Sequence, residues 1–450
     1  MSSSRLRWIC FAGAVAAAQA VAGVTCAAET LSLRHAAEAA LSRNPDMALS
    51  QARLRQAESG LRQAEGAHLP RVSLSVNASH TNDALSAFGL KLGQERITAA
   101  DFNPATLNHP SAISNLNTRV DVTAPLYSGG QIESRRDEAL AHVRAARDGD
   151  AASRQRLLLE LLETYQGVHL ARAYLQVNEQ AQAAAAEYVR VTGSLHKQGM
   201  AVKSDLLSAR VNLENAKLRV SEARRQEATA LDRLKTLTGR RLDEPIEVGA
   251  EAQPVLPAQD AEALRQQAIA GHPALKALRG QVEAAQAATA AARGAGKPQV
   301  NVMVRHDWND HNLGLSAASY TLGGTLSWNA FDGGFNAAAI DRAQAVRLEQ
   351  VARLRQAEDG VAFQVTEARR RALEAEQRLA ARAEAVKEAE EAQRLTRLRY
   401  ENGVTTLVDL LSTQTLLDRA RADLAQARFD LSVSRGQVLQ AAGLLEPEQL

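Results

Sequence analysis

The chain has 450 residues, enough for two or three ordinary domains, but only 4% of them are aromatic. Alanine, leucine, glutamine, glutamate and arginine are abundant, which is typical of long helices packed side by side and argues against thick globular cores. With 53 basic and 51 acidic residues the chain is nearly neutral, so nothing in its charge points to nucleic acid as a partner.

Residues 1–28 have the pattern of a secretory signal. Arg5 and Arg7 precede an apolar run, and small residues end at Ala28. We predict cleavage there, with a membrane anchor as the less favoured alternative because the apolar run is short for a span. Cys26 leaves lipidation open, although the residues before it fit a lipoprotein site poorly. Cleavage would remove both cysteines and any disulfide with them.

The remaining chain repeats itself. An offset of 228 aligns Pro45 with Pro273 and Pro70 with Pro298; further along, an offset of 204 aligns Gly129-Gly130 with Gly333-Gly334 and Gly199 with Gly403. The first half therefore has 24 extra residues between Pro70 and Gly129, which marks a surface loop. We predict two repeats, 29–250 and 251–445, each ordered helix, strand, loop, strand, long helix, tip, helix.

Four segments alternate apolar and polar residues, the pattern of strands with one apolar and one polar face. We predict them over about 71–81 and 116–127, joined by a polar loop over 81–110, and over about 299–308 and 320–331. At about 9 to 11 residues each, they are long enough to cross a bilayer when tilted. No later stretch has about 18 apolar residues without charge, so entry into a membrane would rely on strands.

Each repeat then turns from strand to helix at a glycine pair, Gly129-Gly130 or Gly333-Gly334. Proline-free stretches follow, where we predict helices over about 131–198, 203–238, 335–402 and 407–441. The two longer ones would measure roughly 100 Å at ~1.5 Å per residue. The returning helices alternate large and small residues at the 3.5-residue period of a coiled-coil seam, namely Leu206, Ala209, Leu213, Ala216, Val220 and Ala223, then Leu410, Thr413, Leu417, Ala420, Leu424 and Ala427.

Four strands cannot close a barrel, for which roughly eight is the smallest useful number. In lipid every backbone polar group must be paired, so an open sheet is excluded there. The chain would therefore have to associate, and three copies would supply twelve strands and a ring of helices. The soluble alternative, two hairpins on a helical body, leaves exposed sheet edges that soluble proteins usually avoid.

The signal, the Asn44-Pro45 turn, the turns PLYSGG and AFDGG, and the tips GMAVKSD and GVTTLVD together resemble the TolC family of outer membrane efflux proteins. The resemblance covers about Leu31 to Gly443. It implies an α+β membrane protein, a homotrimer whose 12-stranded β-barrel in outer membrane lipid continues into a long α-helical coiled-coil barrel in the periplasm. It also implies a passive export conduit of a tripartite efflux or type I secretion system, opened by a periplasmic adaptor and an inner-membrane transporter.

The same resemblance assigns roles at the tips. Asp205 and Tyr400 match an acid and a tyrosine that hold the tip closed, and Asp409 matches an acidic ring at the narrowest point. Gly199 and Gly403 match glycines of the groove that takes the adaptor.

Two positions depart from the family pattern. Thr405 replaces a basic gate residue and Ser412 replaces a second acid, so compared with the family pattern we expect a looser gate and weaker cation capture at the ring. The residues also allow a purely structural interpretation, in which Asp205 and Asp409 are helix N-caps and the tip glycines are helix C-caps.

The sequence contains no nucleotide-binding, hydrolase or metalloprotease motif, so we expect no enzyme and no cofactor. The run HDWNDH at 306–311 falls near a predicted loop with nothing to fix a ligand set, and we expect no metal there. The alternative function is a periplasmic structural coiled-coil protein without a pore, which leaves the strands unexplained. A passive porin without partners is disfavoured by the long helices.

Overall fold

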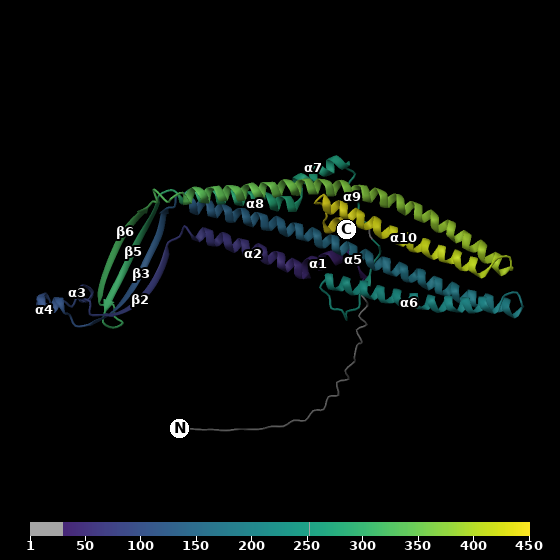
Figure 1. Ribbon diagram of the computed structural model, residues 1–450, viewed down its shortest axis with the longest axis horizontal. Helices are drawn as coiled ribbons and strands as arrows, with labels where there is room; N and C mark the ends of the chain where they lie inside the picture. Colours follow the sequence, from purple (N-terminus) through teal and green to yellow (C-terminus); the bar gives the residue numbers. More distant parts are fainter. Residues whose placement is uncertain (1–29, 252) are drawn as a thin grey trace, which may run out of the picture.

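The computed structural model describes residues 30–251 and 253–450 and shows an elongated rod with a sheet at one end (Figure 1). Long helices run side by side away from the sheet, and two helical tips lie at the far end. The predicted signal, with Cys26, lies outside the described residues. In the part of the chain that is described, no helix has an apolar stretch long enough to cross a membrane.

The sheet has four antiparallel strands in the order β2-β3-β5-β6. Its contact between repeats joins β3 to β5, and β2 and β6 are its two edges. β6 ends earlier than the predicted 331, because pairing stops where β5 begins and Gln299 lies opposite Ser327. The strands are β2 (Arg71–Thr81), β3 (Ile113–Tyr127), β5 (Gln299–Asp310) and β6 (Ala317–Ser327).

The offsets between the repeats also relate the strand pairings. In the first hairpin Arg71 lies opposite Thr123, and in the second Gln299 lies opposite Ser327. Moving Arg71 by 228 and Thr123 by 204 gives the second pair, so the two hairpins have the same register. A one-residue slip would move every side chain to the other face, so this shared register places both apolar faces on one side of the sheet.

Helices form the rod, and α5 and α9 contain 67 residues each, about 100 Å of helix. α5 packs against α2, α6, α8 and α10, and α9 packs against α7, α8 and α10. Small residues of the predicted seams are buried in both returning helices, among them Ala209, Ala216, Ala420 and Ala427. The helices are α1 (Leu33–Arg43), α2 (Pro45–Gly66), α5 (Gln131–Lys197), α6 (Lys203–Leu237), α7 (Ala261–Gly271), α8 (Pro273–Ala295), α9 (Phe335–Glu401) and α10 (Leu407–Ala441).

The connection from β2 to β3 is folded, although the sequence led us to expect a polar loop over 81–110. It contains α3 (Ala84–Gly93), η1 (Ala99–Phe102) and α4 (Pro104–Asn108). Asp83 caps α3 by accepting the Ser86 N–H at 2.9 Å, and the rings of Phe88 and Phe102 pack edge to face with centroids 5.8 Å apart.

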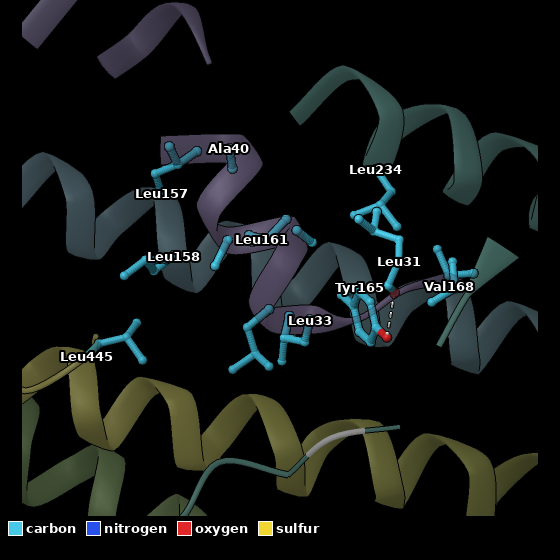
Figure 2. Packing of buried hydrophobic residues seen from close by; sticks show 14 of the residues in the cluster. Leu31, Leu33, Ala40, Leu157, Leu158, Leu161, Tyr165, Val168, Leu234 and Leu445 are labelled. Atoms are coloured by element: carbon cyan, nitrogen blue, oxygen red, sulfur yellow. Dashed lines mark hydrogen bonds between the residues drawn. The ribbon is translucent and has the colours of Figure 1, made fainter. Parts of the chain in front are cut away.

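A hydrophobic core near the middle of the rod joins α1 to α5, beside the paired short strands β1 (Thr30–Leu31) and β4 (Glu247–Val248) (Figure 2). The hydroxyl of Tyr165 donates to the Leu31 carbonyl oxygen at 3.2 Å. This core fixes the helices at a point far from both the sheet and the tips, and η2 (Pro447–Gln449) ends the chain next to it. Its side chains include Leu33, Ala40, Leu157, Leu158, Leu161, Val168, Leu234 and Leu445.

Candidate channel wall and helical tips

One face of the sheet carries a ladder of polar side chains between β3 and β5. Arg119 Nε donates to Asp307 Oδ1 at 2.7 Å, and Arg305 Nε donates to Asp121 Oδ1 at 2.7 Å. Asn117 donates to Asp307 at 3.1 Å. Alternate residues of a strand point to the same side, so these side chains share one face. Its charges are paired, and the face is therefore polar without being strongly of one sign.

The opposite face is apolar and exposed in the single chain. Val72 of β2 is 70% exposed and Leu322 of β6 is 74% exposed, and Leu74, Val76 and Leu326 are also exposed. Tyr320 and Trp328 flank the apolar residues of β6, about 27 Å apart along an extended strand. Monomeric soluble proteins rarely expose large contiguous apolar patches, whereas membrane strands carry an apolar band between aromatic girdles.

Glycine pairs connect this sheet to the long helices, as predicted. Gly129 and Gly130 have φ of 66° and 86°, and Gly333 and Gly334 have φ of 64° and 89°, in the left-handed region that favours glycine. The surroundings of the two turns differ. A Cβ on Gly129 would lie 2.5 Å from the carbonyl oxygen of Gly294 at the end of α8, whereas a Cβ on Gly333 would meet open space.

The tip glycines end the long helices. Gly199 and Gly403 have φ of 78° and 72°. The N–H of Met200 donates to the Leu195 carbonyl oxygen at 2.9 Å, and the N–H of Val404 donates to the Arg399 carbonyl oxygen at 2.9 Å. This is the hydrogen-bond pattern of a helix C-cap, so the structural interpretation holds at both positions. Docking of an adaptor at these glycines stays a prediction.

Tyr400 is buried at the end of α9. Its side chain is 5% exposed, and its hydroxyl shares a 2.8 Å hydrogen bond with the hydroxyl of Thr192 on α5, which is 0% exposed. This bond ties the long helices of the two repeats together. Asp205 is half-buried in the first turn of α6, and no hydrogen bond joins it to Tyr400 in the described chain. Closure through Tyr400 and Asp205 together stays a prediction.

Asp409 is exposed in the first turn of α10. Its carboxylate accepts from the Thr406 hydroxyl at 2.6 Å and from the Thr405 hydroxyl at 2.9 Å, and its own N–H donates to the Thr406 hydroxyl at 3.2 Å. The hydrogen bond from the Thr406 hydroxyl has the largest effect, and together with that from Thr405 it holds the pKa of the Asp409 carboxyl below its usual range. Thr406 is therefore the N-cap, and Asp409 completes the capping box from the third helical position, so the interpretation of Asp409 as the N-cap itself is wrong. An acidic ring made by several copies stays a prediction. At the other tip Val202 is the N-cap and provides no side-chain acceptor, so the interpretation of Asp205 as an N-cap is wrong.

A buried polar cluster near the tips escaped the sequence analysis. Tyr188 accepts from Gln393 Nε2 and donates to Gln414 Oε1, both at 2.6 Å, and Gln414 donates to Asp418 at 2.8 Å. Burial raises the pKa values of Tyr188 and Asp418. The cluster joins α5, α9 and α10. A signal was present, because Gln414 follows Leu410 at the spacing that puts both on one helix face.

The run at 306–311 does not gather into a ligand set. His306 packs on Trp308 with centroids 4.2 Å apart, and Asp307 is bonded to Arg119. Across residues 30–251 and 253–450, no three His, Cys, Asp or Glu residues are grouped in a way that could hold a metal ion.

Comparison with known proteins agrees with this architecture. The outer membrane efflux protein family matches residues 36–240 and 264–444, most of both repeats. The chain belongs to this family. As an outer membrane efflux protein it is localised to the outer membrane, with its helices extending into the periplasm, and its family is one of transport channels.

Solved structures of outer membrane proteins share the fold of this efflux protein. VceC of Vibrio cholerae is 17% identical, with 91% of this chain and 96% of that chain covered and a TM-score of 0.76. The CmeC channel of Campylobacter jejuni is 17% identical, with coverage of 91% and 85% and a TM-score of 0.78. The open state of the MtrE channel of Neisseria gonorrhoeae is 19% identical, with coverage of 92% and 89% and a TM-score of 0.73. No curated protein matches this chain at a comparable significance.

Proposed function

We propose that three copies of this efflux protein form a passive channel, with a barrel of twelve strands above a ring of helices. The sheet carries the proposal: it has an exposed apolar face, a polar face, and two edge strands, β2 and β6. In lipid the backbone groups of both edges need partners, and only other copies of the chain can supply strands of matching length and polarity.

The internal repeat indicates how neighbouring copies would pair. Within the chain, the contact between repeats places Asp121 of β3 opposite Arg305 of β5. Adding the offset of 204 to Asp121 gives Thr325 of β6, and subtracting the offset of 228 from Arg305 gives Asn77 of β2. We therefore infer that β6 of one copy pairs with β2 of the next in this register, which keeps the apolar residues of both strands on the lipid side.

The glycine turns support the same contact. Gly129 lies against Gly294 of α8: a Cβ on Gly129 would clash with the Gly294 carbonyl oxygen, and a Cβ on Gly294 would lie 2.9 Å from the backbone nitrogen of Gln131. By the same offsets, Gly333 corresponds to Gly129 and Gly66 corresponds to Gly294. Gly333 and Gly66 both have open space around them in the single chain, as expected for positions that a neighbouring copy would cover.

The tips are the proposed gate and docking site. Tyr400, Asp205 and Asp409 would hold the closed state, and an adaptor would dock at Gly199 and Gly403. A neutral hydrogen bond such as that between Tyr400 and Thr192 contributes only about 0.5–1.5 kcal/mol net, so binding of a partner can shift the tip to an open state. The energy for export would come from an inner-membrane transporter, which would also select the substrate in a tripartite efflux or type I secretion system.

Cysteine cross-linking in native membranes tests the assembly, since Cys10 and Cys26 are the only natural cysteines of the sequence. The double variant Asn77→Cys/Thr325→Cys is expected to give covalent trimers on oxidation, because each copy would be linked to both neighbours. Asn77→Cys alone is the background control. Ser79→Cys with Thr325→Cys shifts the register by two residues and is expected to cross-link far less. If the matched pair Asn77→Cys/Thr325→Cys gives monomers alone after oxidation, both the proposed register and the closed barrel are wrong.

A further inference from the structure

The folded connection between β2 and β3, residues 82–112, bonds to the sheet through Gln94. Gln94 is the C-cap of α3, and its side-chain amide donates to Asn115 Oδ1 and to the Ser114 carbonyl oxygen, both at 2.9 Å. Gln94 is 6% exposed and Asn115 is 5% exposed. Breaking this contact would leave buried amide groups without hydrogen-bond partners, which is unfavourable, so the connection is anchored to the sheet.

The anchor lies on the polar face of the sheet. Asn115 donates to Asn309 Oδ1 at 3.0 Å, and Asn117 donates to the same oxygen at 3.2 Å. Asn117 also bonds to Asp307, the partner of Arg119. The end of α3 therefore continues the same ladder of polar side chains that would line the pore, at the end of the sheet farthest from the long helices α5 and α9 (Figure 1).

Further contacts hold the connection together as one unit. Lys91 of α3 forms an ion pair with Asp101 of η1, and Asp101 accepts the Thr98 N–H at 2.7 Å. The bond from Lys91, with those from Thr98, lowers the pKa of Asp101 to about 2, so the ion pair persists at any physiological pH. Arg96 donates to Gln94 Oε1 at 3.2 Å and ties this unit back to the anchor.

The second hairpin has no such unit. Its connection spans only 311–316, and Ser316 donates to Asp310 Oδ2 at 2.8 Å directly across the strand ends. Each copy therefore supplies one folded connection on the polar face, and a closed barrel would carry one at every second hairpin.

We propose that residues 82–112 form a lid on the water-facing side of the outer mouth of the channel, where they limit the size of the solutes that leave. This inference rests on the proposed function, because the polar face lines a pore only in the closed barrel. The anchor is made of neutral amides, and the Lys91–Asp101 pair is internally neutralised. The lid would thus restrict solutes by size more than by the sign of their charge.

A cross-link tests the position of the lid without requiring a channel. A Cβ on Gly93 would lie 3.9 Å from Cγ of Asn309. Gly93→Cys/Asn309→Cys is expected to form a disulfide within one chain on oxidation, seen as protection of both thiols from alkylation. Gly93→Cys/Trp308→Cys is the matched control, because the neighbouring residue points to the apolar face. Equal cross-linking of the two pairs would place the segment elsewhere and overturn the lid.

Labelling tests its effect on passage. Thr123→Cys places a thiol on the polar face near the helical end of β3. Added outside intact cells, a small methanethiosulfonate should label it at the same rate with or without Gln94→Ala, whereas a polymer-linked maleimide should react several-fold faster in Gln94→Ala. Asn312→Ala, in the short connection, is the control that should change neither rate.

A second variant replaces residues 85–110 by a Gly-Ser linker as long as the short second connection. It should show the same faster maleimide reaction, which would show that the effect is not peculiar to Gln94→Ala. Unchanged maleimide rates in both variants would overturn the lid. Failure of the small reagent to reach Thr123→Cys in every variant would instead contradict the channel itself.

Discussion

The two tips of this efflux protein share a glycine turn but begin their returning helices differently. At the second tip Thr406 and Asp409 form a reciprocal capping box, whereas at the first tip Val202 offers no acceptor and the carboxylate of Asp205 makes no hydrogen bond in the described chain. Residues matched by the repeat offset therefore do not share one role. Asp409 is engaged by its own helix, and we predict that Asp205, rather than Asp409, contacts a neighbouring chain or an adaptor.

The largest expected difference between the repeats lies at the strand-to-helix turns. Gly129→Ala would combine a left-handed φ with a Cβ against Gly294, and we expect it to lower stability by about 3 kcal/mol. Gly333→Ala should cost about 1–2 kcal/mol from its backbone conformation alone, and more in the assembled protein if Gly66 of a neighbour covers it. Thermal unfolding followed by circular dichroism measures both losses.

Gly360→Ala, in the middle of α9 with open space around it, is the control and should be neutral or slightly stabilising. An unchanged melting temperature in Gly129→Ala would contradict the close contact with α8. A loss in Gly333→Ala that grows on assembly would support the contact between copies.

These turns were predictable from the sequence because glycine pairs after an alternating segment leave few alternatives. The strands were predictable for a related reason: period-two alternation fixes a face, and the repeat offsets fix the register. The folded connection over 82–112 was not predictable in the same way, since side-chain contacts such as Phe88 with Phe102 and Lys91 with Asp101 join α3 to η1 and leave no periodic pattern in the sequence. The bond between Thr192 and Tyr400 joins residues 208 positions apart, and no local pattern encodes it.

The next largest difference concerns the last turn of each long helix. Tyr400→Phe leaves the buried Thr192 hydroxyl without its partner, and we expect a loss of about 1–3 kcal/mol and a higher single-channel conductance in planar bilayers. The matching residue of the first repeat is His196, whose Nδ1 pairs with the Ala201 carbonyl oxygen inside its own tip, so His196→Ala should affect conductance less.

Thr192→Val provides the control for this bond. Combined with Tyr400→Phe it should add little further loss, because both changes remove the same interaction. Full additivity of the two losses, or wild-type conductance in both single variants, would show that this bond does not contribute to closure.

A smaller effect is expected from exchanging the N-caps of the returning helices. Thr406→Val copies the first tip and should cost about 1 kcal/mol, while Val202→Thr copies the second and should stabilise the start of α6 by up to about 1 kcal/mol through a new capping box with Asp205. Amide hydrogen exchange in the first turns of α6 and α10 measures both changes. Equal protection before and after the exchange would show that the caps do not cause the difference between the tips.

The smallest expected difference depends on pH and separates Asn44 from its counterpart His272. Each caps a helix that begins with proline: the Asn44 side chain accepts the Asp46 N–H at 2.8 Å, and His272 Nδ1 accepts the Ala274 N–H at 3.1 Å. Burial lowers the pKa of His272 below its ordinary 6.5. His272 therefore binds a proton more readily in the unfolded chain than in the folded one. The contribution of neutral His272 to the free energy of unfolding is present above pH 6.5 and should be lost as the pH falls through the folded-state pKa.

His272→Asn copies the first repeat and should flatten this loss, measured as the difference between denaturant midpoints at pH values above and below 6.5. Burial also lowers the pKa of His169, which is unchanged in the variant, so the comparison isolates His272. His35→Asn, on the exposed face of α1, serves as the control. An identical pH dependence in wild type and His272→Asn would exclude the cap as a source of acid sensitivity.

The unequal connections of the two hairpins bear on why one chain carries two repeats. A ring assembled from identical single repeats would have to place the long connection on all of its hairpins or on none. Joining two copies in one polypeptide lets them diverge, so that 82–112 contains α3, η1 and α4 while 311–316 stays short. Duplication followed by such divergence would give a ring in which hairpins with a long folded connection alternate with hairpins with a short one.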